Sequence, residues 1–157
     1  MRPNNIEEEK QKFEKNLKEA FIFDEKGYID IETGFLRENL LTNEAIALAE
    51  CFRYENLTNS QIRNFFNEVK AIRNILDNKE ENWNKVYPMT LMLKSKINYK
   101  YNRNKDSEKK LKTLKKFIEK SVDKIIEENK KNNGYETFKN FVIYFEVTMG
   151  FAKLKNN

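Results

Sequence analysis

The sequence predicts an all-α fold, a compact bundle of about five to six helices. The chain has 157 residues with only four Gly and two Pro, and a many-stranded fold needs more of these turn residues. Charged residues make up 35% of the chain, chiefly Lys and Glu, which are good helix formers. Apolar residues recur at helical spacing in most segments. At this length we expect one domain over residues 1–157, which removes roughly two thirds of its unfolded surface from water.

Two helices and an irregular segment are expected in the first third of the chain. A first, very polar helix follows from the spacing of its apolar residues, which are Ile6, Phe13, Leu17 and Phe21. The next segment, FDEKGYIDIETG, contains two glycines and alternating apolar residues, so we expect a turn or a short extended piece. A second helix runs from about Leu36 to Phe52, on the pattern of Ala45, Ile46, Leu48, Ala49 and Phe52.

The stretch LTNSQIRNFF, residues 57–66, predicts the start of the third helix. Thr58 and Gln61 fit a capping box, in which the Thr hydroxyl accepts the backbone N–H of Gln61 and the Gln side chain accepts that of Thr58. Leu57 and Ile62 fit the hydrophobic staple that accompanies such a box. These local roles leave Arg63 unexplained.

The fourth helix is expected to begin near Pro88, after a third helix that runs from Asn59 to about Asp77. Proline suits the first turn of a helix, because its missing N–H would be unpaired there in any case. The apolar spacing predicts an inward face made of Met89, Met92, Leu93, Ile97 and Tyr101.

The fifth helix is expected to be capped by Asp106 or Ser107. Its apolar stripe consists of Leu111, Leu114, Ile118, Val122, Ile125 and Ile126. The run Asn132-Asn133-Gly134 should stop it with a residue able to take positive φ.

The last helix, from about Tyr135 to Lys153, is apolar nearly all round. One side carries Phe138, Phe141, Val142, Phe145, Met149 and Ala152. The opposite side adds Ile143, Tyr144, Val147 and Phe151. Such a helix is either the centre of a bundle or a face that another chain covers, and we favour the centre.

Composition argues against several kinds of function. The absence of His removes Ser-His-Asp and Cys-His nucleophilic sites, and with one Cys it removes His/Cys zinc sites. Carboxylates alone could build a metal-dependent nuclease, but the five Asp are scattered along the chain. We therefore expect no catalytic site, no cofactor and no metal. Cys51 fits a core position in a reducing cytoplasm, and the longest strongly apolar run, Phe141–Phe145, is too short to span a bilayer.

Positive charge is concentrated in residues 94–116. Ten Lys and Arg stand there against two acidic residues, a local net charge of +8, so the rest of the chain contributes −3 to the total of +5. This pattern is typical of a surface on which a polyanion docks. The alternative is that these lysines form solvated helix faces in a chain that uses Lys and Asn heavily throughout.

Two helical rows of cations and amides are suited to phosphate contacts. The third helix carries Arg63, Asn67, Lys70 and Asn74, and the fourth carries Lys96, Lys100 and Arg103. We expect these rows to form one outward track for a nucleotide chain. Stacking of bases on Tyr99, Tyr101 or Trp83 is a further option, although aromatic residues at helical spacing are more often core.

Three stretches of the chain resemble a known family. LTNSQIRNFF resembles the Thr-x-x-Gln-Ile-Arg helix start of the small subunit of type III-A CRISPR (Csm) effector complexes. LMLKSKINYKYNR is similar to the Leu-Lys-x-basic-x-x-Tyr segment of that family, which ends in Arg, and FVIYFEVTMGFAKL is similar to its C-terminal helix. The resemblance covers about residues 40–154, so we divide the chain into a variable N-terminal extension (1–35) and a core bundle (36–154).

The resemblance implies a non-catalytic, all-helical, RNA-binding structural subunit of an antiviral complex, located in the cytoplasm. Its implied partners are CRISPR RNA and target RNA, whose duplex it lines, and the other Csm subunits, including the backbone subunit and further copies of itself; no membrane is implied. The family often has Gly where this chain has Asn102. Taken together, the motifs and the two rows give these candidate RNA-binding residues: Arg63, Lys70, Lys94, Lys96, Lys100, Arg103 and Lys153.

Three alternatives remain open at this point. Arg63 could pair with Glu68 or with a neighbouring helix instead of RNA. The whole protein could be a helical protein–protein adaptor without direct nucleic-acid contact, using the apolar excess of its last helix. The third alternative is the carboxylate metal nuclease.

Overall fold

The computed structural model describes residues 3–156, and within them the fold is all-α. Its helices are α1 (Pro3–Ala20), α2 (Ile22–Lys26), α3 (Asn43–Tyr54), α4 (Asn59–Leu76), α5 (Trp83–Tyr101), α6 (Lys105–Lys110), α7 (Lys112–Asn129) and α8 (Gly134–Phe151), with short 3-10 helices η1 (Glu38–Leu41) and η2 (Glu80–Asn82). No strand is present in this part of the chain, only an isolated bridge between Ile29 and Leu36. The predicted fold class is confirmed. The second predicted helix begins as η1, and the fifth is split into α6 and α7. Two more elements were not predicted: η2 precedes α5, and α2 occupies the first residues of the segment expected to be a turn or short extended piece, in which the only extended pairing is the isolated bridge between Ile29 and Leu36.

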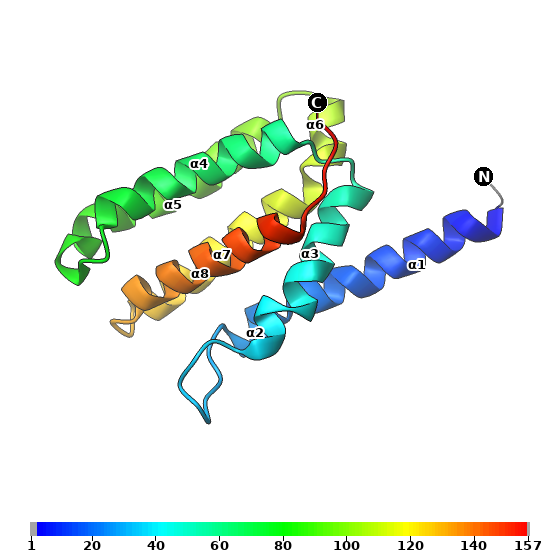
Figure 1. Ribbon diagram of the computed structural model, residues 1–157. Helices are drawn as coiled ribbons and strands as arrows, with labels where there is room; N and C mark the ends of the chain where they lie inside the picture. The colour runs from blue at the N-terminus through cyan, green and yellow to red at the C-terminus, as the bar shows by residue number, and fades with distance from the viewer. Residues whose placement is uncertain (1–2, 157) are drawn as a thin grey trace.

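Helix α8 lies at the centre of the bundle. Helices α4 and α5 form an antiparallel pair over α7 and α8, and α3 runs across this stack (Figure 1). Helix α8 contacts α3, α4 and α7, and both of its apolar sides are largely covered. The expectation that the last helix is the hub is confirmed. Helix α1 packs along α3, and its N-terminal half projects beyond the bundle (Figure 1).

An aromatic cluster fills the middle of the core. Phe117 of α7 packs against Phe23, Phe141, Tyr144 and Phe145, with ring centroids 5.4–5.9 Å apart. Phe117 is fully buried, although the predicted stripe of the fifth helix did not include it. The remaining stripe residues of that helix are buried as predicted, apart from Ile126, which is partly buried.

A buried polar group, here called the Glu44 cluster, ties the N-terminal segment to α3 and α8. The carboxylate of Glu44 is fully buried and accepts two hydrogen bonds from Arg37, at 2.7 and 2.8 Å, and one from Asn39 at 2.7 Å. Hydrogen bonding to Glu44 raises the pKa of Arg37 above its ordinary value. The Tyr144 hydroxyl donates to the backbone oxygens of Ala20, at 2.7 Å, and of Glu44, at 3.2 Å. Each desolvated group therefore has a partner, as burial of charge requires.

The predicted start of the fourth helix is wrong. Helix α5 begins at Trp83, so Pro88 is its sixth residue and the carbonyl of Asn84 lacks its helical donor. The early start is held by Trp83, whose side chain is only 7% exposed and donates from Nε1 to Oδ1 of Asn129 at 2.8 Å. Tertiary packing thus outweighs the preference of proline for the first turn. Met92, expected to face inward, is 56% exposed, which is a second correction on this helix.

The N-terminal cap of α6 differs from expectation, whereas the run Asn132-Asn133-Gly134 ends α7 with a residue of positive φ, as predicted. Asn104, rather than Asp106 or Ser107, caps α6 by accepting the backbone N–H of Ser107 at 2.8 Å. Asn132 takes the positive φ of 61° after α7, whereas Gly134 opens α8. Gly134 is required there for another reason: a Cβ on it would lie 2.5 Å from Oδ1 of Asn129, the atom that Trp83 binds.

Within residues 3–156 no helix combines the length and the apolar character that a membrane crossing requires.

Candidate nucleic-acid interface

The first turn of α4 is built as its sequence predicts. The Thr58 hydroxyl accepts the backbone N–H of Gln61 at 3.2 Å, and Oε1 of Gln61 accepts that of Thr58 at 3.0 Å. Leu57 and Ile62 are both buried in the hydrophobic core, as expected for the staple. The capping box and the burial of its flanking apolar residues are confirmed.

The C-terminal tail crosses the start of α4. The backbone N–H of Asn59 donates to the carbonyl of Lys155 at 2.9 Å, and its amide side chain donates to the carbonyl of Leu154 at 3.3 Å. The same amide donates to Oδ1 of Asn156 at 2.9 Å. These bonds place a tail with two exposed lysines, Lys153 and Lys155, beside the turn that carries Arg63.

Arg63 is exposed and makes no ion pair with any residue in 3–156. The carboxylate suggested as its local partner, Glu68, lies instead 3.9 Å from Nζ of Lys96. Pairing of Arg63 with Glu68 or a neighbouring helix is therefore not what the structure shows. Its guanidinium remains in solvent.

Lys100 and Arg103 lie together where α5 ends. They share a pocket of about 90 Å³ with two amides of α4, Gln61 and Asn64, and the pocket is closed by Ser107, Leu111 and Leu114. Neither cation pairs with a carboxylate in the described part of the chain. Asn102, where the family often has Gly, has a φ of −82°, so this position needs no left-handed backbone and tolerates Asn without strain.

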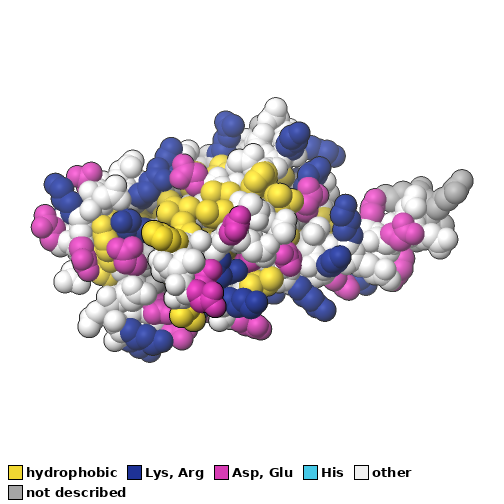
Figure 2. All heavy atoms as spheres, turned by 60° about the horizontal axis from the view of Figure 1, so that its bottom comes forward, with side chains coloured by type: hydrophobic (Ala, Val, Ile, Leu, Met, Phe, Trp, Pro, Cys, Tyr) yellow, Lys and Arg dark blue, Asp and Glu magenta, His cyan; other side chains and the backbone are white. Residues whose placement is uncertain are grey.

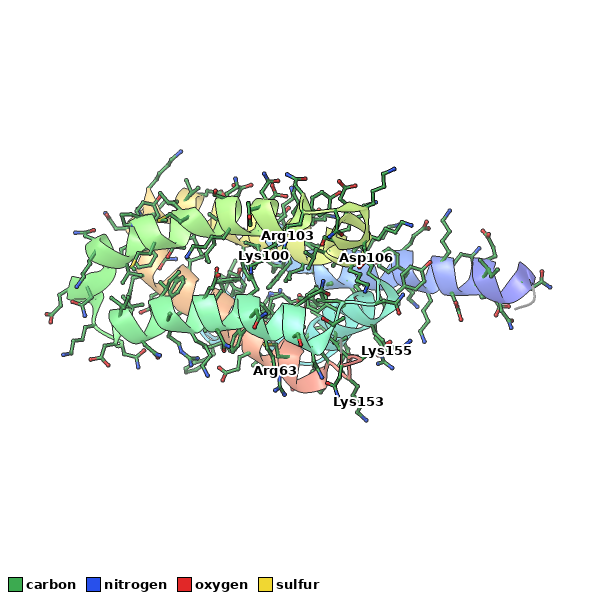
Figure 3. All side chains as sticks on the ribbon, turned by 90° about the horizontal axis from the view of Figure 1, so that it is seen from above. Arg63, Lys100, Arg103, Asp106, Lys153 and Lys155 are labelled. Carbon is green, nitrogen blue, oxygen red and sulfur yellow. The ribbon has the colours of Figure 1, made fainter. Side chains whose placement is uncertain are left out.

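The two predicted rows do not form one continuous track. Successive helical residues are about 100° apart, so Arg63 points about 200° away from Gln61, which faces Lys100. In Figure 3, Arg63 lies on the edge of α4 beside which the tail residues Lys153 and Lys155 also lie, whereas Lys100 and Arg103 lie on the α5 side, near Asp106. The cations gather around one end of the bundle instead of along one face.

We call this region the basic end. Its members are exposed or half-buried cations that make no ion pair within residues 3–156: Arg63, Lys100, Arg103, Lys105, Lys109, Lys153 and Lys155. The one carboxylate of α6 that does pair is Asp106, which lies 3.2 Å from Lys110. Lys155 was missed among the candidate residues, because only the contact of the tail with Asn59 brings it to this end.

The remaining candidate residues have partners inside the molecule. Lys94 lies 2.7 Å from Asp123 of α7, and Lys96 lies 3.9 Å from Glu68 of α4. Lys70 sits over the ring of Phe66, 5.9 Å from its centroid. These three positions lie further along the α4–α5 pair, and their charges are partly satisfied without RNA.

Cys51 and Glu55, both outside the basic end, have raised pKa values that burial explains. Burial raises the pKa of the Cys51 thiol to about 12, as suits a core residue. Burial also raises the pKa of Glu55, whose carboxylate accepts the backbone N–H of Thr113 at 2.8 Å in the first turn of α7. Among the described residues no three Asp, Glu or Cys side chains gather as a metal site would require.

A comparison with known protein families tests the resemblance to the type III-A small subunit. A sequence model of the family described as Csm2 Type III-A matches residues 36–157, which is well over half of the chain. The chain belongs to the Csm2 family. Family membership makes it a structural subunit of a type III-A CRISPR effector complex, in which it works with the other Csm subunits. No curated protein and no solved structure gives a significant match to this Csm2 chain.

Proposed function

We propose that this Csm2 chain is a non-catalytic subunit that contacts the guide and target RNA of its complex through the basic end. The single observation that carries the proposal is the gathering at one end of the bundle of seven cations that make no ion pair within residues 3–156. Figure 3 labels five of them, and the other two, Lys105 and Lys109, lie on α6. An exposed cation that pairs with no carboxylate can take a phosphate without first giving up a partner. Lys94, Lys96 and Lys70 are expected to contribute less to RNA binding, because each already has a partner within the protein.

The contacts are expected to hold the RNA backbone without reading its sequence. Lys and Arg that reach phosphate oxygens gain mainly from the release of counterions, so affinity falls as salt rises. The slope of log affinity against log salt is roughly −0.9 for each neutralised duplex phosphate and roughly −0.7 for a single strand. One subunit makes few contacts, so tight binding is expected only when several subunits engage the same RNA.

The test compares a double variant with a matched control. The variant Lys100→Ala/Arg103→Ala removes two unpaired cations, and the control Lys94→Ala/Lys96→Ala removes two cations of the same helix that have carboxylate partners. Binding of labelled RNA duplex and single strand is measured by fluorescence anisotropy from low to high salt. We expect the first variant to bind more weakly and to lose about two phosphates from its salt slope. Equal behaviour of the two variants would overturn the proposal.

A second candidate function, that of a protein adaptor, is supported by the loop before η1. Ile31 is 97% exposed and Phe35 is 76% exposed, and exposed apolar patches with a polar rim mark interaction sites. The loop is ordered by hydrogen bonds from Asp30 N to Phe35 O and from Gly34 N to Asp30 O, both 2.8 Å. Figure 2, which turns this side forward, shows apolar side chains among the charged ones. The additional apolar side of α8, on which the adaptor alternative first rested, is largely covered: Tyr144 is buried, Ile143 and Val147 are half-buried, and Phe151 is 42% exposed.

The loop suits a partner surface that is apolar and rimmed by basic residues, because Asp30, Glu32 and Glu38 surround its apolar tip. We expect Ile31→Ser/Phe35→Ser to reduce co-purification of the other Csm subunits with the tagged chain. The control is Ile6→Ser, which removes an exposed apolar residue on the projecting half of α1. Unchanged co-purification of the loop variant would remove this candidate.

A further inference from the structure

Tyr99 differs from every other tyrosine of the described chain. Tyr28, Tyr135 and Tyr144 are buried, Tyr54 stacks on Phe13, Tyr87 packs on Trp83, and Tyr101 lies under the ammonium group of Lys115. Tyr99 is 73% exposed, and its ring contacts no other ring or cation within residues 3–156. Its hydroxyl has no hydrogen-bond partner there either. An amphipathic ring is thus presented to solvent in the most basic segment of the chain.

The surface around Tyr99 is concave and polar. A depression of about 540 Å³ is lined by Ser95, Asn98, Tyr99, Asn102 and Arg103, all from the last turns of α5 and the residues that follow it. The side chains of Ser95, Asn98 and Asn102 make no hydrogen bond with the described residues, so their donors and acceptors face solvent. Arg103 belongs to the basic end and pairs with no carboxylate. No acidic residue lines the depression.

This combination suits a nucleotide better than a protein. A protein hot spot around an exposed aromatic is normally a desolvated pocket with apolar surroundings. Here the ring is bordered by a hydroxyl, two amides and a guanidinium. Aromatic rings stack on bases, amides hydrogen-bond base edges, and guanidinium groups bind phosphate. These three requirements of one nucleotide, a stacking ring, donors and acceptors for the base edge and a cation for the phosphate, are met by neighbouring side chains on one stretch of chain.

We propose that Tyr99 is a stacking platform for an unpaired RNA base, with Asn98 and Asn102 facing the base edge and Arg103 holding the adjoining phosphate. The proposal rests on the proposed function, since the RNA must already lie at the basic end. It also selects among the aromatic residues singled out from the sequence. Trp83 is buried and bonded to Asn129, and Tyr101 is covered by Lys115.

The preferred ligand is therefore RNA with unpaired bases. In a continuous duplex each base is already stacked on its neighbours, and an added stack on Tyr99 would require one to leave. A single strand, a gap or a strand end presents the base without that cost. We expect Tyr99 to raise the binding affinity for single-stranded RNA and to have little effect on the affinity for a fully paired duplex.

The experiment combines substitutions of Tyr99 with the removal of bases from the RNA. Wild-type chain, Tyr99→Ala, Tyr99→Trp and the control Met92→Ala are titrated at low salt against a labelled single strand and against the same strand with abasic sites. Met92 lies two turns earlier on the same helix and is also exposed. Circular dichroism melting checks that each variant is folded.

We expect Tyr99→Ala to weaken binding of the intact strand by about five- to a hundredfold, the range for one aromatic–base stack. Tyr99→Trp should retain the affinity, Met92→Ala should match wild type, and the abasic strand should not distinguish wild type from Tyr99→Ala. The proposal is overturned if Tyr99→Ala binds the intact strand like wild type, or if it weakens both strands equally.

The salt slope separates this proposal from the proposed function. Stacking adds no phosphate contact, so Tyr99→Ala should keep the wild-type slope, whereas Lys100→Ala/Arg103→Ala should reduce it. If the wild-type chain shows the expected salt slope but Tyr99→Ala does not change the affinity, the stacking role of Tyr99 is rejected and the proposed function is not. Absence of salt-dependent binding by the wild-type chain rejects both.

Discussion

The Glu44 cluster and the basic end differ in how their charged side chains are partnered. In the Glu44 cluster, a fully buried carboxylate is bonded by Arg37 and Asn39, and Arg37 also donates from Nε to the carbonyl of Gly27 at 2.9 Å. At the basic end, Arg63, Lys100 and Arg103 pair with no carboxylate in the described chain. A buried charge without a partner strongly destabilises a protein, whereas an exposed one costs little. The comparison separates charges that hold the fold from charges available to a ligand.

The largest effect is expected from breaking the Glu44 cluster. Glu44→Ala leaves the half-buried Arg37 without its carboxylate and removes a fully buried group from the cluster, so the free energy of unfolding should fall by about 3–5 kcal/mol. Urea denaturation followed by circular dichroism measures it. The matched control is Glu50→Ala, since Glu50 pairs with Arg53 on the surface of the same helix and should cost at most about 1 kcal/mol. Similar losses in the two variants would erase the contrast between the regions.

A smaller loss of stability is expected when one hydrogen-bond donor of the cluster, the Tyr144 hydroxyl, is removed. Tyr144→Phe keeps the ring in the aromatic core but leaves the carbonyls of Ala20 and Glu44 without this hydrogen bond. The free energy of unfolding should fall by about 1–3 kcal/mol, the cost of buried polar groups left unsatisfied. A change below about 0.5 kcal/mol would mean that water replaces the hydroxyl.

Arg63, on the edge of the basic end away from Lys100 and Arg103, is expected to affect RNA binding but not stability. Arg63→Ala should leave the free energy of unfolding within about 0.5 kcal/mol of wild type, because the side chain is exposed and unpaired. It should make the salt slope of RNA binding shallower by roughly 0.7–0.9, equivalent to one lost phosphate contact. Arg73→Ala is the control, since Arg73 pairs with Glu146 at 3.2 Å. If both arginines change the slope alike, freedom from an ion pair is not what selects RNA contacts.

The smallest effect is expected from Lys96→Ala. Its ammonium group lies 3.9 Å from Glu68, both side chains are partly solvated, and such a pair contributes at most about 1 kcal/mol to stability. Thermal melting at low and high salt measures it. A loss of stability as large as that of Glu44→Ala would place Lys96 among the residues that hold the fold.

Local features of the fold could be predicted from the sequence, and long-range ones could not. The capping box at Thr58 depends on residues three apart, and it forms as predicted. Pro88 was placed wrongly because the start of α5 depends on Trp83 reaching Asn129, 46 residues away. Glu44 gave no signal of its burial, since its partners are brought to it by η1, which contains Asn39, and by Arg37 directly before η1.

The candidate site shows the same limit. The residue types and the concentration of charge in 94–116 are visible in the sequence, and Arg63 could be singled out by elimination. Its position relative to Lys100 depends on how α4 and α5 are rotated about their axes, which the helical spacing within either helix does not determine. The contribution of Lys155 depends on the path of the tail over Asn59.

The position of Phe23 has a practical consequence for choosing where to cut the gene. Phe23 precedes the segment that matches the family, yet it is fully buried against Tyr28, Phe117 and Tyr144. A fragment trimmed to the matched residues would lose α1 and α2 together with the buried side chains of Phe23 and Tyr28, and would expose to water the side chains of α3, α7 and α8 that they cover. Expression of this subunit should therefore keep the leading residues, however little they resemble those of its relatives.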